Sequence, residues 1–182
     1  MALPADYLLP QHGGDWTLDD VLALPEDSSQ RVELVDGSLI VSPLGTRRHQ
    51  RLIGGIYKAL DGACPPGHEA TIELNVGMPG GNLFIPDFTV TTSPEAEGLL
   101  CPAEDLLLVG EVLSPSTRFK DYGIKRQRYA AAGVPFYLLV EPTGPVATMF
   151  ELENGEYVET ARSEAGVLKL ERPFPVTIEL SP

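Results

Sequence analysis

Residues 106–129 read LLLVGEVLSPSTRFKDYGIKRQRY. The apolar run at 106–109 is typical of a strand that is buried on both faces of a sheet. Near the end of this strand stands Glu111, which must have a cation, a hydrogen-bond donor or water beside it, because burying a lone carboxylate is costly. Turn residues at 114–117 and a basic segment at 118–128 follow. Together these features indicate a functional site rather than a piece of core.

The composition is that of a soluble globular chain. Its 182 residues are 43% hydrophobic and 21% charged, which is ordinary for one domain with a substantial core. No apolar stretch reaches the roughly 18 residues that span a bilayer, and the first residues lack the positive charge of a secretory signal. Cys64 and Cys101 form no metal motif and suit a reducing compartment. We therefore expect a single cytoplasmic domain over 1–182 with no membrane partner.

The charge is unevenly distributed along the chain. A net charge of -13 argues at first against a nucleic-acid partner. However, residues 47–58 carry four basic side chains and no acid, and residues 118–128 carry five basic side chains against Asp121, so each segment has a net charge of +4. Two basic patches on an acidic body are either solvated helix faces or contacts for an anionic partner, and the pattern leaves both interpretations open.

The N-terminal part predicts a helix and a hairpin. Residues 17–20 have the pattern of a helix N-cap with an acid at the third position, which predicts a short helix. Asp36-Gly37 between two apolar runs predicts a tight hairpin turn, because both residues tolerate positive φ. Glu33 alternates with its apolar neighbours in the first strand of that hairpin, so it projects from the opposite face.

The helix expected at 47–60 is amphipathic. At 100° per residue its apolar side chains form one stripe, and Arg47, Arg51 and Lys58 lie on the opposite one. His49 projects near the apolar side in the first turn, where a histidine is more often a core residue than a functional one.

Strands are expected next at 71–78 and 83–91, joined by a glycine-rich turn. The second strand contains Pro86-Asp87, and a proline there indicates an edge or a bulge, which can re-aim the next side chain. The remaining apolar runs predict a buried strand at 136–140 and short antiparallel strands at 146–152, 157–161, 167–170 and 176–180.

A second helix is expected at 119–132 and ends at Gly133, since glycine is typical of the residue after a helix. Asp121, Lys125 and Tyr129 are spaced i, i+4, i+8 and share one face of this helix. Lys125 can therefore form a helical ion pair with Asp121 or point towards the strand that carries the buried acid.

From residue 47 onward the expected order is helix, three strands, helix, strand, which predicts an α/β (α+β) fold with a mixed central sheet flanked by helices. Asp87 and Glu111 fall on the second and third of these strands. Adjacent strands bring both carboxylates within reach of one cation, and the carbonyl of Val112 can supply a third oxygen. Such a water-rich oxygen site suits Mg²⁺ or Mn²⁺, which stabilises charge on phosphoryl oxygens and activates water.

This order of elements resembles the αβββαβ core of the PD-(D/E)XK nuclease superfamily, with residues 86–87 and 111–113 as its two motifs. Within it, the chain resembles the Uma-two family, a bacterial group of restriction-endonuclease-like proteins. The matching motifs are RVELVDG at 31–37, SP at 42–43, HQ at 49–50, PD at 86–87, EVLSPST at 111–117, Asp121, Lys125, Tyr129 and GVP at 133–135. They cover about 16–142, so that 143–182 is expected to be a C-terminal β extension.

The resemblance implies roles for individual side chains. The superfamily's lysine position in the second motif is Leu113 here, which can neither orient water nor offset charge. The Uma-two resemblance implies that Lys125 replaces it. Glu33 is the family's further acid, which completes the metal shell or holds a water, although an exposed hairpin glutamate is the alternative. The resemblance also implies pocket positions for His49, Asp121 and Tyr129.

Three functions are compatible with these residues. The first is a metal-dependent endonuclease acting on nucleic acid, DNA before RNA, whose backbone phosphates are held by Arg47, Arg51, Lys58, Arg126 and Arg128. The second is a catalytically inactive module that binds nucleic acid or protein, which Leu113 and the acidic body favour. The third is a hydrolase of another phosphate ester. A homodimer is expected by analogy with restriction enzymes that pair two sites, and no base-reading motif predicts sequence specificity.

Overall fold

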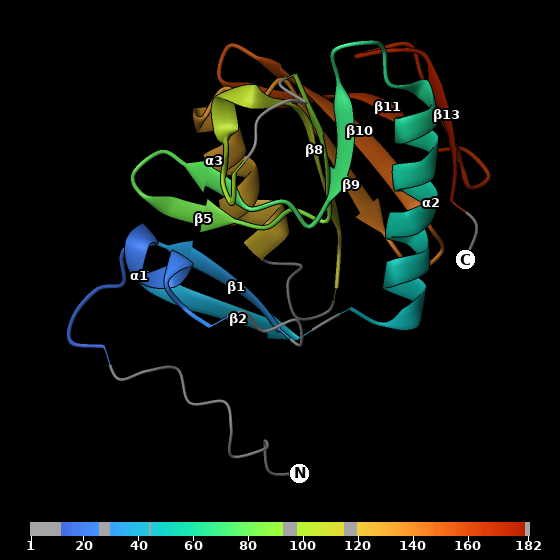
Figure 1. Cartoon of the computed structure of the whole chain (residues 1–182). Helices are drawn as coiled ribbons and strands as arrows, with labels where there is room; N and C mark the ends of the chain where they lie inside the picture. Colours follow the sequence, from blue (N-terminus) through green and yellow to red (C-terminus); the bar gives the residue numbers. More distant parts are fainter. Residues whose placement is uncertain (1–11, 26–29, 44, 93–97, 115–119, 181–182) are drawn as a thin grey trace.

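The fold is described from a computed structural model, in which the described residues are 12–25, 30–43, 45–92, 98–114 and 120–180, with backbone only for 120–122. Figure 1 shows a larger sheet with a long helix on one side of it. A smaller sheet, which includes the N-terminal hairpin, lies on the opposite side. The pocket described below lies where these two sheets meet.

The larger sheet is mixed, as the sequence predicts. Its strand order is β11 (Glu156–Arg162), β10 (Val146–Glu153), β9 (Phe136–Glu141), β8 (Leu106–Val112), β6 (Phe88–Thr91) and β3 (Glu69–Ile72). The neighbours β8 and β9 run parallel, whereas the other neighbouring pairs of this sheet are antiparallel. The strand β8 lies inside the sheet and is buried along almost its whole length, because both of its faces are covered.

The smaller sheet has the order β2 (Ser38–Pro43), β1 (Gln30–Val35), β5 (Asn82–Phe84), β4 (Val76–Met78) and β7 (Cys101–Pro102). The hairpin β1–β2 turns at Asp36 and Gly37, whose φ angles are 47° and 76°, which confirms the predicted tight turn with positive φ at both residues. A further antiparallel pair, β12 (Val167–Leu170) and β13 (Val176–Glu179), follows the larger sheet in the chain.

The prediction of single strands at 71–78 and 83–91 is wrong. Each stretch divides between the two sheets, with β3 and β6 in the larger one and β4 and β5 in the smaller one. The chain leaves the larger sheet at Glu73, whose φ of 51° ends a strand. It returns through Pro86, which has no N–H to continue a ladder. Asp87 therefore lies at the crossing between the sheets, immediately before β6, and not inside a strand.

The helices cover the larger sheet. The helix α2 (Arg47–Ala63) buries its apolar stripe against one face, together with residues of β12 and β13 (Figure 1). On the other side lies a π-helical segment η2 (Lys120–Lys125), which continues as α3 (Arg126–Ala131). Residue 119, the first of the helix predicted at 119–132, lies outside the described residues. The described part is π-helical at first and then α-helical, and it stops before Gly133 as predicted, with φ 79° at that glycine.

Two short helices complete the described elements. The helix α1 (Leu18–Leu22) begins with the predicted capping box, in which Thr17 and Asp20 each bond the other's backbone. It packs on the β1 hairpin through Val21 and Leu34. A short 3₁₀ turn, η1 (Ala103–Asp105), leads into β8.

Alternation along β8 decides which layer each side chain meets. Leu108 packs with the α2 core, and Val109 packs with the core formed by α3, the smaller sheet and residues of β9 and β10. Glu111 is two residues after Val109, so its carboxylate lies on the same side of the sheet as α3.

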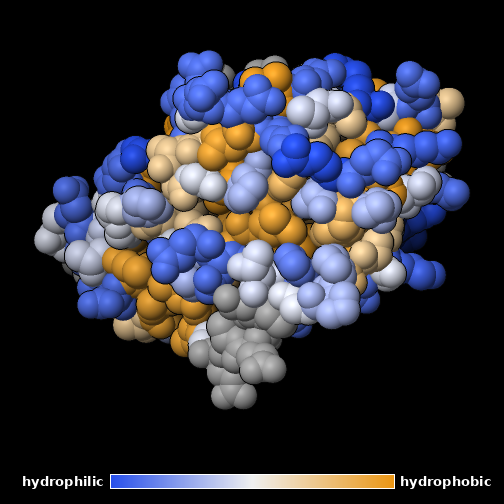
Figure 2. All heavy atoms as spheres, turned by 90° about the horizontal axis from the view of Figure 1, so that it is seen from above, coloured by the Kyte–Doolittle hydropathy of each residue, from blue (hydrophilic) through white to orange (hydrophobic). Residues whose placement is uncertain are grey.

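The surface of the molecule is mixed in polarity. Seen from above, hydrophilic residues surround hydrophobic patches on the surface (Figure 2). In the described part of the chain, no helix is long and apolar enough to cross a membrane.

Candidate active site

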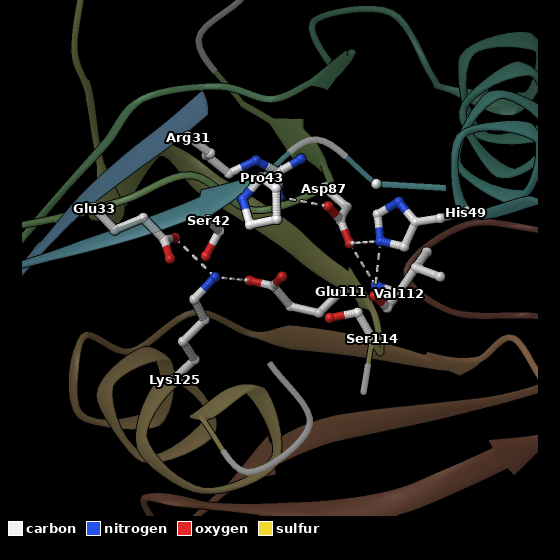
Figure 3. A pocket seen from close by; sticks show the side chains of 11 residues that line it. Arg31, Glu33, Ser42, Pro43, His49, Asp87, Glu111, Val112, Ser114 and Lys125 are labelled. Atoms are coloured by element: carbon white, nitrogen blue, oxygen red, sulfur yellow. Dashed lines mark hydrogen bonds and ion pairs between the residues drawn. The ribbon is translucent and has the colours of Figure 1, made fainter. Parts of the chain in front are cut away.

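A pocket opens between the β1–β2 hairpin, the start of α2 and the end of β8 (Figure 3). It contains six of the residues that the sequence analysis singled out for chemistry, brought together from five segments of the chain. Its lining residues are Arg31, Glu33, Ser42, Pro43, Gly45, His49, Asp87, Glu111, Val112, Ser114 and Lys125. Three carboxylates and three basic side chains therefore share one small space.

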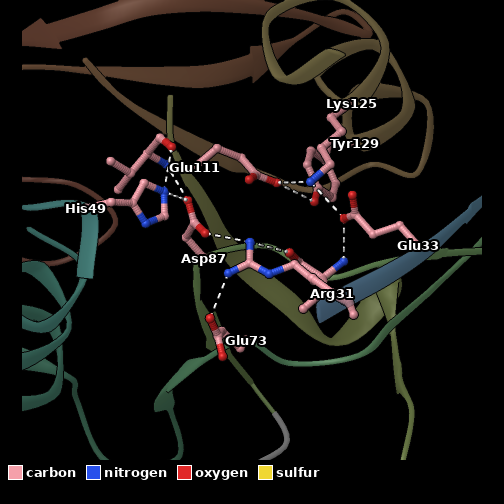
Figure 4. A network of polar contacts seen from close by, with 10 residues as sticks. Arg31, Glu33, His49, Glu73, Asp87, Glu111, Lys125 and Tyr129 are labelled. Atoms are coloured by element: carbon pink, nitrogen blue, oxygen red, sulfur yellow. Dashed lines mark hydrogen bonds and ion pairs between the residues drawn. The ribbon is translucent and has the colours of Figure 1, made fainter. Parts of the chain in front are cut away.

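Asp87 is held by groups from three elements (Figure 4). Its Oδ1 accepts a hydrogen bond of 2.7 Å from Nη1 of Arg31, and its Oδ2 accepts one of 2.6 Å from the backbone N–H of Val112. Nε2 of His49 lies 3.4 Å from Oδ2. Because β6 pairs with β8 in the register Phe88 to Gly110, Asp87 lies next to the end of β8, where Glu111 stands.

His49 links the first turn of α2 to the same corner. Its Nε2 lies 2.9 Å from the carbonyl oxygen of Val112, so this nitrogen carries the proton and donates it to that carbonyl. Its Nδ1 is buried and has no hydrogen-bond partner in the described structure. The backbone at Gly45 approaches the ring so closely that a Cβ there would lie 2.4 Å from Nδ1. His49 is therefore a buried pocket residue and not only a part of the apolar core.

Glu111 and Glu33 share one ammonium group. Nζ of Lys125 lies 3.0 Å from Oε1 of Glu111 and 2.8 Å from Oε1 of Glu33. The hydroxyl of Tyr129, which is fully buried, donates to the same oxygen of Glu111 at 3.1 Å. Oε1 of Glu33 also accepts the N–H of Ile85 at 2.8 Å. Glu33 is thus a buried member of the pocket and not an exposed hairpin residue.

The surroundings shift the pKa values of the groups at this corner. Burial acts to raise the pKa of Asp87, but the hydrogen bond from His49 and the charge of Arg31 outweigh it, so that the pKa lies below its usual 3.8. Burial acts to lower the pKa of His49, but Asp87 outweighs it and raises this pKa above 6.5. Burial, and then the charges of Glu111 and Glu33, raise the pKa of Tyr129 well above 10, so its hydroxyl stays a donor.

The donor set fits a hard divalent cation. Asp87, Glu111 and Val112 line one pocket, and magnesium is commonly bound by one or two carboxylates while it keeps several waters. Zinc prefers nitrogen and sulfur donors, and among the described residues no three His, Cys, Asp or Glu side chains are placed to hold a metal together. A cation in this pocket would therefore take its remaining ligands from water, as magnesium commonly does.

The basic residues predicted to hold phosphates have different surroundings. Arg47, Arg51 and Lys58 are exposed along α2, whose first turn borders the pocket. Arg126 instead lies over the ring of Phe150 and donates to the carbonyl of Tyr157 at 2.6 Å, so it is tied to the C-terminal strands.

The other predicted residues are placed as follows. Arg128 pairs with Asp36 of the hairpin turn at 2.6 Å. The side chain of Asp121 and residues 115–119 lie outside the described part of the structure. Leu113, at the position of the superfamily lysine, is buried in the apolar core on the α3 side.

Sequence reasoning missed Arg31 and Glu73 as members of this site. Arg31 binds Asp87 through Nη1 and Oε1 of Glu73 through Nη2, each at 2.7 Å. A signal for Arg31 was present, because it precedes Glu33 by two residues in a strand and so points to the same face. Glu73 carried no such signal, since its position depends on the crossing between the two sheets.

Comparison with known proteins agrees with this geometry. A family model described as "Uma2: Putative restriction endonuclease" matches residues 18–182. The chain belongs to the Uma2 family. The description places the chain in a restriction-endonuclease-like family, and families of this kind generally use divalent metals. The Uma2 match also includes residues 143–182, beyond the 16–142 covered by the motifs.

A solved structure has the same fold. It is the crystal structure of a putative nuclease belonging to DUF820 from Anabaena variabilis, which is 19% identical to this chain with a TM-score of 0.69. The alignment covers 87% of this chain and 89% of that one, so the Uma2 chain has its fold over nearly the whole length. No curated protein matches the chain.

Proposed function

We propose that this Uma2 protein is a magnesium- or manganese-dependent endonuclease that hydrolyses phosphodiester bonds of DNA. The observation that carries the proposal is the meeting of Asp87 and Glu111 in one open pocket, with Lys125 on Glu111. Burying two carboxylates on neighbouring segments costs desolvation free energy. Such buried charged groups are typical of functional sites, where the charge takes part in the chemistry.

Asp87, Glu111 and the Val112 carbonyl are the ligands for the ion in this proposal. When bound, the ion supplies Lewis-acid stabilisation of charge on the phosphoryl group and activation of water. Lys125 offsets the developing negative charge and orients the nucleophile through its contacts with Glu111 and Glu33. Tyr129 holds the Glu111 carboxylate in place through its hydrogen bond.

The substrate class follows from the exposed basic stripe of α2. The stripe consists of Arg47, Arg51 and Lys58, on the helix whose first turn contributes His49 to the pocket. A nucleic acid whose phosphates bind these side chains would therefore extend towards the pocket. The test is cleavage of supercoiled plasmid, linear duplex, single-stranded DNA and RNA with Mg²⁺, Mn²⁺ or EDTA. We expect metal-dependent cleavage of DNA.

The matched variants are Asp87→Asn, Glu111→Gln and, as an exposed control outside the pocket lining, Glu179→Gln. The first two are expected to lower the rate by about 100-fold or more, the usual scale for losing one charged catalytic group, while circular dichroism shows an unchanged fold. The control is expected to cleave as the parent does. Cleavage that survives both site variants would overturn the proposal.

A second function is a nuclease-fold module that binds nucleic acid or protein without cleaving it. Two observations favour it: the core position of Leu113 and the pairing of the pocket carboxylates with internal basic side chains. Such a module loses binding when Arg47 and Arg51 are replaced, but it is indifferent to Glu111→Gln. Hydrolysis of a small phosphodiester without cleavage of DNA or RNA would indicate a third function, a phosphoesterase with a different substrate.

A further inference from the structure

Arg31 bridges two carboxylates that differ in burial (Figure 4). One guanidinium nitrogen binds Asp87, whose side chain is 2% exposed, and the other binds Glu73, whose side chain is 38% exposed. Arg31 itself is 16% exposed and lines the pocket. The guanidinium thus reaches from the innermost carboxylate of the site to one near the solvent.

A cation at Asp87 must compete with this guanidinium. Oδ1 of Asp87 is taken by Arg31, and Oδ2 already accepts the N–H of Val112 and lies near His49. A divalent ion and a guanidinium on the same buried carboxylate repel each other strongly, since interactions between charges are weakly screened there. Asp87 can therefore bind a divalent ion only if Arg31 gives up its contact with Oδ1.

Glu73 can hold the Arg31 guanidinium after its contact with Asp87 is broken. Its Oε1 already holds Nη2 of Arg31 at 2.7 Å, so the guanidinium need not be left unpaired when it leaves Asp87. Glu73 stands where the chain crosses between the sheets, in a left-handed conformation with φ 51° that non-glycine residues rarely adopt. The carboxylate of Glu73 lies next to Arg31, and Glu73 is not among the residues that line the pocket.

We infer that Arg31 is an internal counter-ion of the metal site, which occupies Asp87 until a divalent ion displaces it and which Glu73 then retains. This inference rests on the proposed metal-dependent function and names the residue that sets its affinity for the ion. Arg31 is a positioning residue in this account, because it acts on the ion through Asp87.

The test is calorimetric titration with Mn²⁺ alone, without nucleic acid. We compare the parent with Arg31→Gln, Glu73→Gln, the double variant and the remote control Arg162→Gln, which removes an exposed arginine on β11. Arg31→Gln is expected to tighten Mn²⁺ binding by about 10- to 100-fold, the equilibrium equivalent of one charge-assisted hydrogen bond that no longer competes. Arg162→Gln is expected to bind as the parent does.

Glu73→Gln separates this mechanism from simple attraction of the ion by a negative charge. It is expected to weaken Mn²⁺ binding by about threefold or more, because Arg31 keeps only a neutral acceptor at position 73 and is therefore held more strongly by the charge of Asp87. In the double variant this loss should disappear, since no guanidinium remains to be retained. A loss that persists in the double variant would show that Glu73 acts on the ion directly, and would overturn the inference.

The outcomes also separate this inference from the proposed function. Binding by the parent that is lost in Asp87→Asn but unchanged or weakened in Arg31→Gln overturns the role of Arg31 and leaves the metal site standing. No binding by the parent or by Arg31→Gln overturns both. If Arg31→Gln fails to fold, Arg31→Lys replaces it in the single and the double variant, since lysine keeps the charge but cannot bind both carboxylates through one planar guanidinium. An unchanged affinity in Glu73→Gln overturns the inference in either case.

Discussion

The ammonium of Lys125 lies 3.0 Å from the carboxylate of Glu111, although Lys125 belongs to the π-helical segment η2 and Glu111 to the strand β8. The same ammonium lies 2.8 Å from Glu33 of the N-terminal hairpin. One cation thus holds two buried acids from distant parts of the chain. Removing it leaves both carboxylates inside the protein without their shared partner.

Lys125→Met is therefore expected to destabilise the protein strongly. Breaking a buried ion pair by removing one partner costs about 3–5 kcal/mol, and methionine keeps the length of the side chain. The measurement is the free energy of unfolding from urea denaturation at neutral pH. The matched control is Lys169→Met, which removes an exposed lysine of β12 and should change stability little. Equal effects of the two substitutions would contradict the structural role assigned to Lys125.

The pair of His49 and Asp87 predicts how stability changes with pH. The pKa of His49 is raised above 6.5, so its contribution is complete below 6.5 and is lost as the pH rises through the folded-state value. The pKa of Asp87 is lowered below 3.8, so its contribution is present above 3.8 and is lost as the pH falls through the folded-state value. The two effects together favour the mildly acidic range.

Thermal unfolding measured at increasing pH above 6.5 checks the histidine part, since His49 loses its proton as the pH rises through its raised pKa. The parent should lose stability over this range, and His49→Gln should lose much less. The control is Arg162→Gln, which removes an exposed arginine of β11 and should retain the slope of the parent. A parental slope in His49→Gln would show that another group causes the pH dependence.

Gly110 predicts a steric limit inside the larger sheet. A Cβ at this position would lie 1.8 Å from the ring of Phe88, which is fully buried and has no room to move aside. Gly110→Ala is expected to destabilise by about 1–3 kcal/mol through overpacking. Gly54→Ala on α2 is the opposite case, because a Cβ there meets nothing within 4 Å.

Gly54→Ala should therefore stabilise by roughly 0.8–1 kcal/mol, the difference in helix propensity. Both free energies of unfolding come from the same denaturation series. Gly110→Ala as stable as the parent would mean that the strands β6 and β8 are packed less tightly than the structure shows.

The basic stripe of α2 predicts the salt dependence of nucleic-acid binding. If Arg47 and Arg51 each neutralise one phosphate, replacing both by alanine should reduce the slope of log K against log salt by about 1.4–1.8, depending on strandedness. The measurement is fluorescence anisotropy with a labelled oligonucleotide in EDTA over a range of salt concentrations. Arg162→Ala, on β11, is the control and should keep the parental slope. An unchanged slope in the double variant would place the phosphate contacts elsewhere.

Local chemistry made most of the elements predictable. The capping box at Thr17, the turn at Asp36 and the stop at Gly133 depend on a few neighbouring residues, and the structure has each of them. The four C-terminal strands agree with their predicted ranges to within one or two residues. Apolar periodicity over several residues is a strong signal of this kind, because it reports which face of an element is buried.

Proximity in space was not predictable in the same way. Asp87 and Glu111 could be paired from the sequence because neighbouring strands align their ends. Arg126, by contrast, has the composition of a phosphate ligand but packs on Phe150. Whether a charged side chain on a helix meets solvent or another layer depends on how that helix is rotated against its neighbours.

The sequence by itself determined the family, most of the local elements and the presence of Asp87 and Glu111 in one pocket, because these depend on short-range patterns and recognisable motifs. Only the tertiary structure decided that the strands at 71–78 and 83–91 divide between two sheets. That division brings Glu73 and Asp87 to the two terminal nitrogens of the Arg31 guanidinium, so that one positive charge is shared between two carboxylates. Such contacts join residues more than 40 positions apart, and no local propensity encodes them.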